Sequence, residues 1–189
     1  MTLRGYSLVA ALAICVVTAG PLVYRHLSSE APANEKTGET GQSRSPQKAA
    51  KARVHLYFSD EHQRYLRAED RTIAQPESAV ERARSLVNAL IEGPKGSLAR
   101  TIPAETKLLA VFVTQDGIAY VDFDRAMSEK HPGGTFTEFL TVFSIVNTLT
   151  LNMEEIRAVK ILIEGRDAKT LAGHIDIGSS FGANMLVIK

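Results

Sequence analysis

Cysteine is almost absent from this chain of 189 residues. The single cysteine, Cys15, lies in an apolar run near the N-terminus, so the rest of the chain has no thiol. This absence excludes a disulfide framework, a thiol nucleophile and a cysteine metal site from everything after that run. A domain folded there must be stabilised by its hydrophobic core.

A strong charge of either sign is also missing, because the formal net charge is +1. Residues 1–53 carry seven Lys and Arg against three Asp and Glu, whereas residues 54–189 carry fifteen against eighteen. Basic and aromatic residues do not interleave in that second, mildly acidic part. Since nucleic-acid binding depends on neutralising phosphates, this distribution argues against a nucleic-acid partner.

Motifs of catalysis are missing as well. The chain has no Gly-x-Ser-x-Gly nucleophile elbow and no His-Glu-x-x-His metal site. The glycine-rich, basic stretch 93–97 lacks the spacing of a phosphate-binding loop, and a helix end with a surface turn explains it better. These absences favour an interaction module over an enzyme, and we expect no catalytic residue, no cofactor and no metal.

A long apolar run extends from Gly5 to Tyr24, between Arg4 and Arg25. A helix of that length spans about 30 Å, the hydrocarbon thickness of a bilayer. We therefore expect residues 1–27 to form a membrane anchor or a signal segment. Small residues up to Ala19 would permit cleavage, whereas the length of the run favours a retained, single-pass anchor in the inner (cytoplasmic) membrane. The rest of the chain would then face the extracytoplasmic (periplasmic) side.

Residues 28–53 are rich in Ser, Pro, Gly, Glu, Gln and Lys, and alanine is their only apolar residue type. Such a segment buries too little surface to offset the entropy lost on ordering. It is predicted to be a flexible basic linker.

Residues 54–189 have the length of one domain. Their apolar patterns predict the order β-β-α-β-β-α-β-β, with strands at 54–58, 65–73, 108–113, 118–123, 159–163 and 171–177 and helices at 76–92 and 136–152. Both faces of the 108–113 strand are apolar, and the second helix carries a wide apolar stripe that must be buried. This order predicts an α+β fold with two helices on one face of a mostly antiparallel sheet.

Three groups of polar residues are candidate sites. Asp122 and Asp124 could hold a divalent cation from one strand face, although capping of the following turn is the more common role of such residues. Asn147 lies in the apolar helix, where its amide must bond a neighbouring backbone or contact a ligand. His174 and Asp176 could form a general-base pair or be ordinary polar residues of a surface strand.

Short motifs that occur in a fixed order carry a family resemblance. They are Val-His-Leu-Tyr-Phe at 54–58, Leu-Ile-Glu-Gly-Pro at 90–94, Thr-Ile-Pro at 101–103, Ala-Tyr-Val-Asp-Phe at 119–123, Ser-Ile-Val-Asn-Thr-Leu at 144–149, Leu-Ile-Glu-Gly at 162–165 and Leu-Ala-Gly-His-Ile-Asp at 171–176. Together they resemble the GerMN domain, named after a bacterial sporulation and spore-germination protein. The resemblance covers residues 54–189 and implies a fold like the ring-building motifs of secretion and sporulation complexes.

The resemblance implies a function outside the cytoplasmic membrane. We expect a membrane-tethered structural or assembly domain of the bacterial cell envelope, linked to sporulation or germination, whose partners are other envelope proteins or itself. The two helices and the strand 66–73 would supply the contacts. The alternative is a module that binds a small ligand or cell-wall glycan through the 93–103 loop, including Lys95, together with His174.

Overall fold

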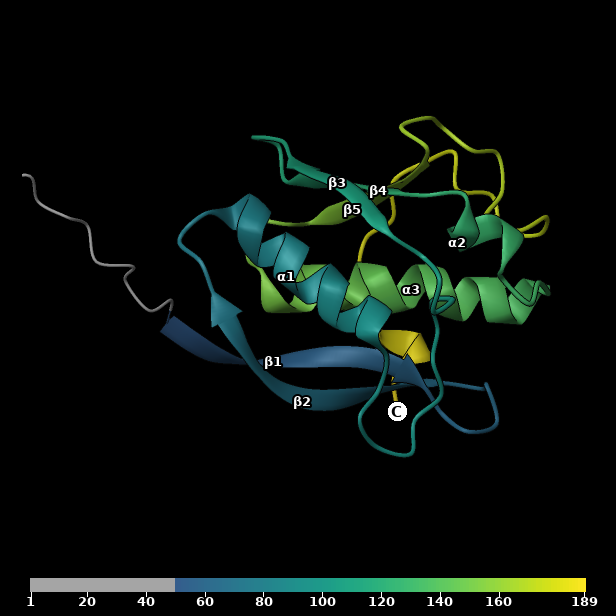
Figure 1. Cartoon of the computed structure of the whole chain (residues 1–189), viewed down its shortest axis with the longest axis horizontal. Coiled ribbons are helices and arrows are strands. Elements are labelled where there is room, and N and C mark those ends of the chain that lie inside the picture. Colours follow the sequence, from purple (N-terminus) through teal and green to yellow (C-terminus); the bar gives the residue numbers. More distant parts are fainter. Residues whose placement is uncertain (1–49) are drawn as a thin grey trace, which may run out of the picture. The chain divides into compact units, whose positions relative to one another are not determined.

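The computed structural model describes residues 50–189 (Figure 1). The expected anchor at residues 1–27, and the expected linker up to residue 49, lie outside the described residues. The last part of that expected linker, residues 50–53, instead begins the first strand. Within residues 50–189, no helix is both long and apolar enough to cross a bilayer.

The strands form two separate sheets. β1 (Ala50–Ser59) and β2 (Leu66–Gln75) pair as an antiparallel hairpin. β3 (Leu108–Val113), β4 (Ile118–Phe123) and β5 (Ala158–Ile163) form the second sheet in the order β3-β4-β5, with β3 and β4 antiparallel and β4 and β5 parallel.

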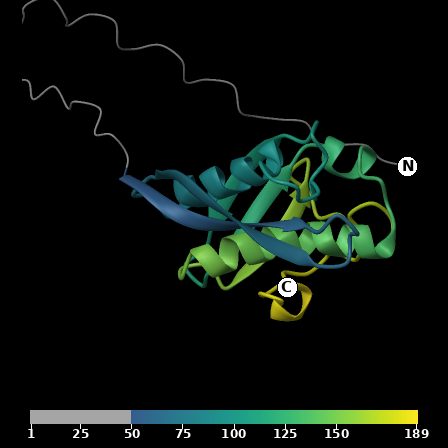
Figure 2. The same cartoon turned by 90° about the horizontal axis from the view of Figure 1, so that it is seen from below.

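Two long helices lie between these sheets. α1 (Ala79–Glu92) and α3 (Thr135–Asn152) have the hairpin on one side and the three-stranded sheet on the other, as Figures 1 and 2 show from two directions. Two short helices, α2 (Ala126–Glu129) and η1 (Met185–Val187), complete the domain. The core fills the space between the layers, and its largest fully buried side chains include Phe58 of β1 and Phe123 of β4.

The burial of α3 explains its composition. A helix that is apolar over most of its circumference must be covered on several sides. Eleven residues of α3 are buried, from Glu138 to Leu149, because sheets cover it above and below. The predicted burial of the apolar stripe is therefore confirmed over most of the helix, whereas Phe136 at its start is 50% exposed.

The α+β class predicted from the sequence is confirmed, and most of the predicted elements are present. The helices nevertheless share two sheets instead of covering one face of a single sheet, and α2 was not predicted. The final predicted strand is wrong, because residues 171–177 make only one isolated bridge, between Thr170 and Asp176. Backbone N–H groups of this segment bond to the Glu138 carboxylate, and a neighbouring strand is not their partner.

Candidate functional site

Asp122 within β4 and Asp124 after it bond different parts of the chain. Asp122 is buried and its Oδ1 accepts the Gly165 N–H at 2.8 Å, whereas Asp124 Oδ1 accepts the Lys107 N–H at 2.9 Å. Each carboxylate therefore fastens a different turn beside the sheet. Among residues 50–189, no group of three or more His, Cys, Asp or Glu side chains is placed to hold a metal ion.

Asn147 is fully buried on α3 and is used inside the domain. Its Nδ2 donates to the Asn184 carbonyl oxygen and its Oδ1 accepts the Asn184 N–H, both at 2.9 Å. The side chain amide thus pairs with one backbone unit as a neighbouring strand would. This pairing holds the C-terminal segment, with η1, against α3.

His174 is paired with a residue that the sequence did not single out. Its Nδ1 lies 2.7 Å from Oε1 of Glu138, in the first turn of α3. Asp176 instead accepts the Gly178 N–H at 2.7 Å in a local turn. The proposed pairing of His174 with Asp176 therefore has no direct contact between the two side chains in the structure.

Glu138 organises the whole 172–175 segment. Its side chain is fully buried, and Oε2 accepts the N–H groups of Ala172, His174 and Ile175 at 2.9–3.1 Å. Burial opposes ionisation and would raise the pKa of this carboxyl group. The hydrogen bonds that it accepts outweigh that effect and lower its pKa from 4.5 to about 2. Glu138 is thus an ionised anchor for the loop.

A second histidine lies near Glu138 in a buried network. His131 Nδ1 accepts the Gly133 N–H at 3.0 Å, so its Nε2 carries the proton and donates to Thr141 Oγ1 at 2.9 Å. Thr141 in turn donates to the Thr101 carbonyl oxygen at 2.6 Å. Burial lowers the pKa of His131, and the negative charge of Glu138 offsets part of that decrease. Both nitrogens of this histidine are therefore engaged within the fold.

The C-terminal end of α1 is capped from outside the helix. Its last turn has no basic residue, and two arginines supply the missing donors: Arg71 of β2 bonds the Gly93 carbonyl oxygen at 2.6 Å and Arg100 bonds the Glu92 carbonyl oxygen at 2.7 Å. Arg71 is itself buried and paired with Glu69 at 2.6 Å. These contacts satisfy carbonyl groups that a helix end leaves unpaired.

The 93–103 loop carries Lys95, but it does not form a deep cleft. The backbone N–H groups of Lys95 and Gly96 donate to the Glu69 carboxylate at 2.9 and 3.1 Å. The open groove beside them has a volume of 410 Å³ and is lined by Glu69, Asp70, Arg71, Thr72, Lys95 and Gly96. His174 does not line it, so the loop and the histidine do not form one site.

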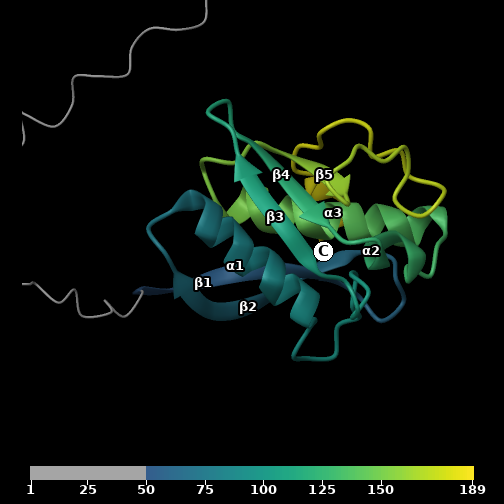
Figure 3. The ribbon, with the colours of Figure 1, turned by 45° about the horizontal axis from the view of Figure 1, so that its top comes forward.

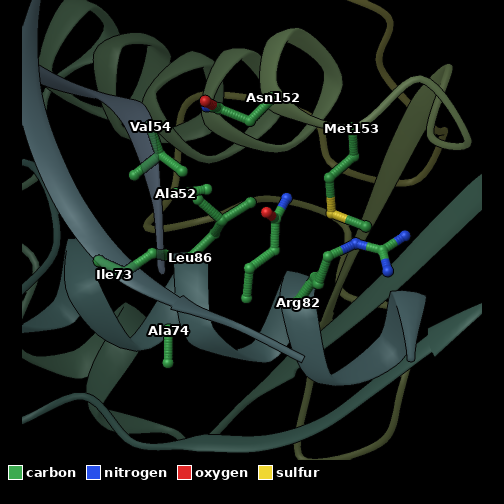
Figure 4. A pocket seen from close by; sticks show the side chains of 9 residues that line it. Ala52, Val54, Ile73, Ala74, Arg82, Leu86, Asn152 and Met153 are labelled. Atoms are coloured by element: carbon green, nitrogen blue, oxygen red, sulfur yellow. The ribbon is translucent and has the colours of Figure 1, made fainter. Parts of the chain in front are cut away.

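A crevice between the hairpin and the helix ends is too small for a ligand. Figure 4 shows its lining, where Ala52 and Val54 of β1 face Leu86 of α1 and Met153. Its free volume of 20 Å³ admits about one water molecule. An organic ligand would need to separate the hairpin from α1.

Apolar side chains remain on the surface. The largest exposed ones are Leu109, Phe112, Phe136, Leu151, Met185 and Leu186. Phe112 of β3 is 61% exposed, although it lies in a regular strand. The exposure of an apolar side chain in β3 could have been expected from the sequence, because the strand is apolar on both faces.

The layered α+β fold is that of a GerMN-type domain. The family model described as "Germane: Sporulation and spore germination" matches residues 55–169, and the chain belongs to this family. The resemblance stated from the sequence motifs is therefore confirmed.

Solved structures agree with this assignment. A candidate lipoprotein from Clostridium perfringens is 29% identical, with a TM-score of 0.50 over 70% of this chain and 88% of that one. The tandem GerMN domains of the sporulation protein GerM from Bacillus subtilis are 24% identical, with a TM-score of 0.54, and cover 70% of this chain and 46% of theirs. The first of those domains alone is 22% identical, with a TM-score of 0.50, and the match covers 71% of this chain and 98% of that one. No curated protein matches the chain significantly.

Proposed function

We propose that this protein is a membrane-tethered assembly domain of the bacterial cell envelope, which binds other envelope proteins or itself. One contrast carries the proposal: the polar residues that could form a site are engaged in internal hydrogen bonds, while apolar side chains are left exposed. Asn147 and Glu138 both bind backbone of their own domain. Phe112 and Leu109 are 61% and 46% exposed on one strand.

Location outside the cytoplasmic membrane has independent support. The chain is 29% identical to a protein titled as a candidate lipoprotein. Its own sequence has the 5–24 apolar run, followed by a polar segment before the domain. We infer that the N-terminal segment holds the domain at the extracytoplasmic surface, and that the domain acts in a process related to sporulation or germination, as its family does.

Capture of partners in cells tests the proposal. Full-length protein with a C-terminal affinity tag is crosslinked in living cells, solubilised in detergent and analysed by mass spectrometry. Phe112→Asp, at the most exposed residue of β3, should lower the capture, and Leu151→Asp on α3 is its matched control.

Two results distinguish assembly from ligand binding. Recovery of envelope proteins, or of multimers of the protein itself, supports an assembly domain. Recovery of uncrosslinked monomer alone would contradict it and would favour the alternative, a glycan or small-ligand module that uses the open groove beside Lys95.

A further inference from the structure

We propose that β3 pairs edge to edge, antiparallel, with β3 of a second copy of this chain, which joins two domains through one continuous sheet. This inference rests on the proposed assembly function and names its partner and its surface.

The protein covers its other strand edges. The free edge of β1 is bonded by α3: Ser144 Oγ donates to the Tyr57 carbonyl oxygen at 2.6 Å, and Thr148 Oγ1 accepts the Tyr57 N–H at 3.1 Å. One turn further along α3, Asn152 exchanges two hydrogen bonds with the His55 backbone, at 2.7 and 2.9 Å. Side chains of α3 thus replace a neighbouring strand.

The outer edge of β5 is also paired. Val159 and Phe181 exchange backbone hydrogen bonds of 2.9 and 2.8 Å. The outer edge of β2 is protected differently, since its residues include the charged Arg67, Glu69 and Arg71. Charged side chains on an edge strand discourage pairing with another chain.

β3 has neither a bonded edge nor charged side chains, and the one irregularity of its ladder with β4 lies between Leu108 and Ala110. Within residues 50–189, Leu108–Val113 make hydrogen bonds only in the ladder with β4. The strand reads Leu-Leu-Ala-Val-Phe-Val and contains no charged residue and no proline. Figure 3 shows β3 at the rim of its sheet. A neutral, unpaired strand edge is a template for another strand.

The outer face of the sheet is covered unevenly toward this rim. Phe112, Tyr120 and Lys160 lie side by side across β3, β4 and β5. Lys160 is buried, and its Nζ donates to the carbonyl oxygen of Ile177 at 3.0 Å, whereas Phe112 is 61% exposed. Strand pairing at the edge of β3 would give the exposed Phe112 side chain a neighbour on the same face of the extended sheet.

The hydrogen bonds of the β3–β4 turn show which residues of β3 direct their backbone groups to the free edge. The Thr114 N–H bonds the Ile118 carbonyl oxygen at 3.0 Å, so Thr114 directs its backbone toward β4. Alternate residues of an antiparallel strand direct their backbone groups to opposite sides, and Val111 therefore directs its groups to the free edge. Leu109 and Val113 share this direction, and we place the twofold axis at Val111, the central residue of the three. The large Phe112 then lies opposite the small Ala110 of the second copy.

The strand is compatible with a second copy of itself. Leu108–Val113 carry no charged side chain, so two copies meet without like charges along the pair. Asp116, in the turn after the strand, is engaged by Arg157 of its own domain at 3.5 Å. An antiparallel pair places the large Phe112 beside the small Ala110, whereas an in-register parallel pair would place Phe112 beside Phe112.

The contact is small, so we expect weak association that depends on tethering. Six paired residues bury less surface than a stable interface requires. Two chains held at the same membrane have a high effective concentration, which strengthens such contacts. The test accordingly uses the full-length chain in its membrane.

A register-specific disulfide tests the pairing. Two differently tagged full-length chains, both with Cys15→Ser, are expressed together, one with Ala110→Cys and the other with Phe112→Cys. Residues opposite each other at such a position lie about 4.5–5.5 Å apart, which permits a disulfide. Leu186→Cys in both chains controls for random collision, because Leu186 is 92% exposed. Equal thermal unfolding of the variants confirms that they are folded.

We expect the mixed Ala110–Phe112 disulfide to exceed either homodisulfide and the Leu186 control. Absence of the mixed disulfide, or equal yields from all pairs, overturns the β3 pairing. If cell crosslinking still captures envelope proteins in that case, only this inference fails; if it captures none, the proposed function fails as well.

Discussion

Thr148 and Tyr57 lie 91 residues apart in the sequence, and Thr148 Oγ1 accepts the hydrogen bond of the Tyr57 backbone N–H at 3.1 Å. Both residues are buried. The contact joins the central helix to the edge of the hairpin, and with Ser144 and Asn152 it pairs backbone groups that would otherwise form an open strand edge. The domain thus covers one edge with its own helix and leaves another, that of β3, available.

Thr148→Val tests the energetic role of this contact. Valine has nearly the same shape but cannot accept a hydrogen bond, so the buried Tyr57 N–H loses its partner. We expect the free energy of unfolding to fall by about 1–3 kcal/mol in urea denaturation. Thr150→Val is the control, since the Thr150 hydroxyl bonds only the Val146 carbonyl oxygen of its own helix. A loss no larger than that of the control would contradict the assigned role.

Glu138→Gln should destabilise the domain at neutral pH by about 2 kcal/mol or more. The glutamine amide cannot accept all the hydrogen bonds that the carboxylate accepts from the 172–175 segment, and it lacks the charge that pairs with His174. Urea unfolding measures the loss, and amide exchange locates it. Unchanged protection of residues 172–175 would show that Glu138 does not anchor this loop.

The pH dependence of stability gives a separate test of Glu138. Its pKa is lowered from 4.5 to about 2 in the folded domain, so protonation favours the unfolded chain. The stabilisation is fully present above pH 4.5 and is lost as the pH falls toward about 2. The difference in unfolding free energy between wild type and Glu138→Gln should therefore shrink across that interval. A constant difference would contradict the ionised anchor.

Asn147→Leu should release the C-terminal segment. The variant removes both hydrogen bonds to the Asn184 backbone and should cost about 1–3 kcal/mol. Limited proteolysis should then cut near residue 184 faster than in wild type, with Leu151→Ala as a control on the exposed side of α3. Normal stability combined with lost partner capture would instead identify Asn147 as a contact residue.

Gly93→Ala should destabilise the end of α1. Gly93 has a φ of +88°, and a Cβ at this position would lie 2.5 Å from Arg100 Nη2, whose guanidinium caps the helix. We expect a loss of about 1–3 kcal/mol in thermal or urea unfolding. Gly96→Ala is a matched control, because its nearest neighbour would be Glu69 Oε2 at 3.6 Å. Equal effects of the two substitutions would exclude a special backbone requirement at Gly93.

Local patterns in the sequence predicted most elements of the fold. The helix ending before Gly93 and the two strands around Gly117 depend on apolar periodicity and turn residues that are close together in the chain. Local patterns predicted the segment 171–177 wrongly. Its apolar alternation resembles a strand, but its backbone bonds a carboxylate on α3. A contact over more than thirty residues leaves no local pattern.

In the candidate site, too, the sequence indicated single residues but not their distant partners. His174 was noticed, and its partner was sought two residues away at Asp176. The partner is Glu138, whose only signal was an acidic residue in the first turn of a strongly apolar helix. Similarly, Lys95 and His174 were assigned to one hypothetical ligand site, although His174 does not line the groove that contains Lys95.

The sequence by itself determined the two long helices, the first five strands and the GerMN-type assignment, because these follow from local periodicity and ordered motifs. Only the tertiary structure decided which polar groups meet and which strand edge stays open. Those outcomes depend on hydrogen-bond partners brought together from distant segments: α3 completes the edge of β1, Phe181 completes that of β5, and β3 is left for a second chain in the proposed pairing.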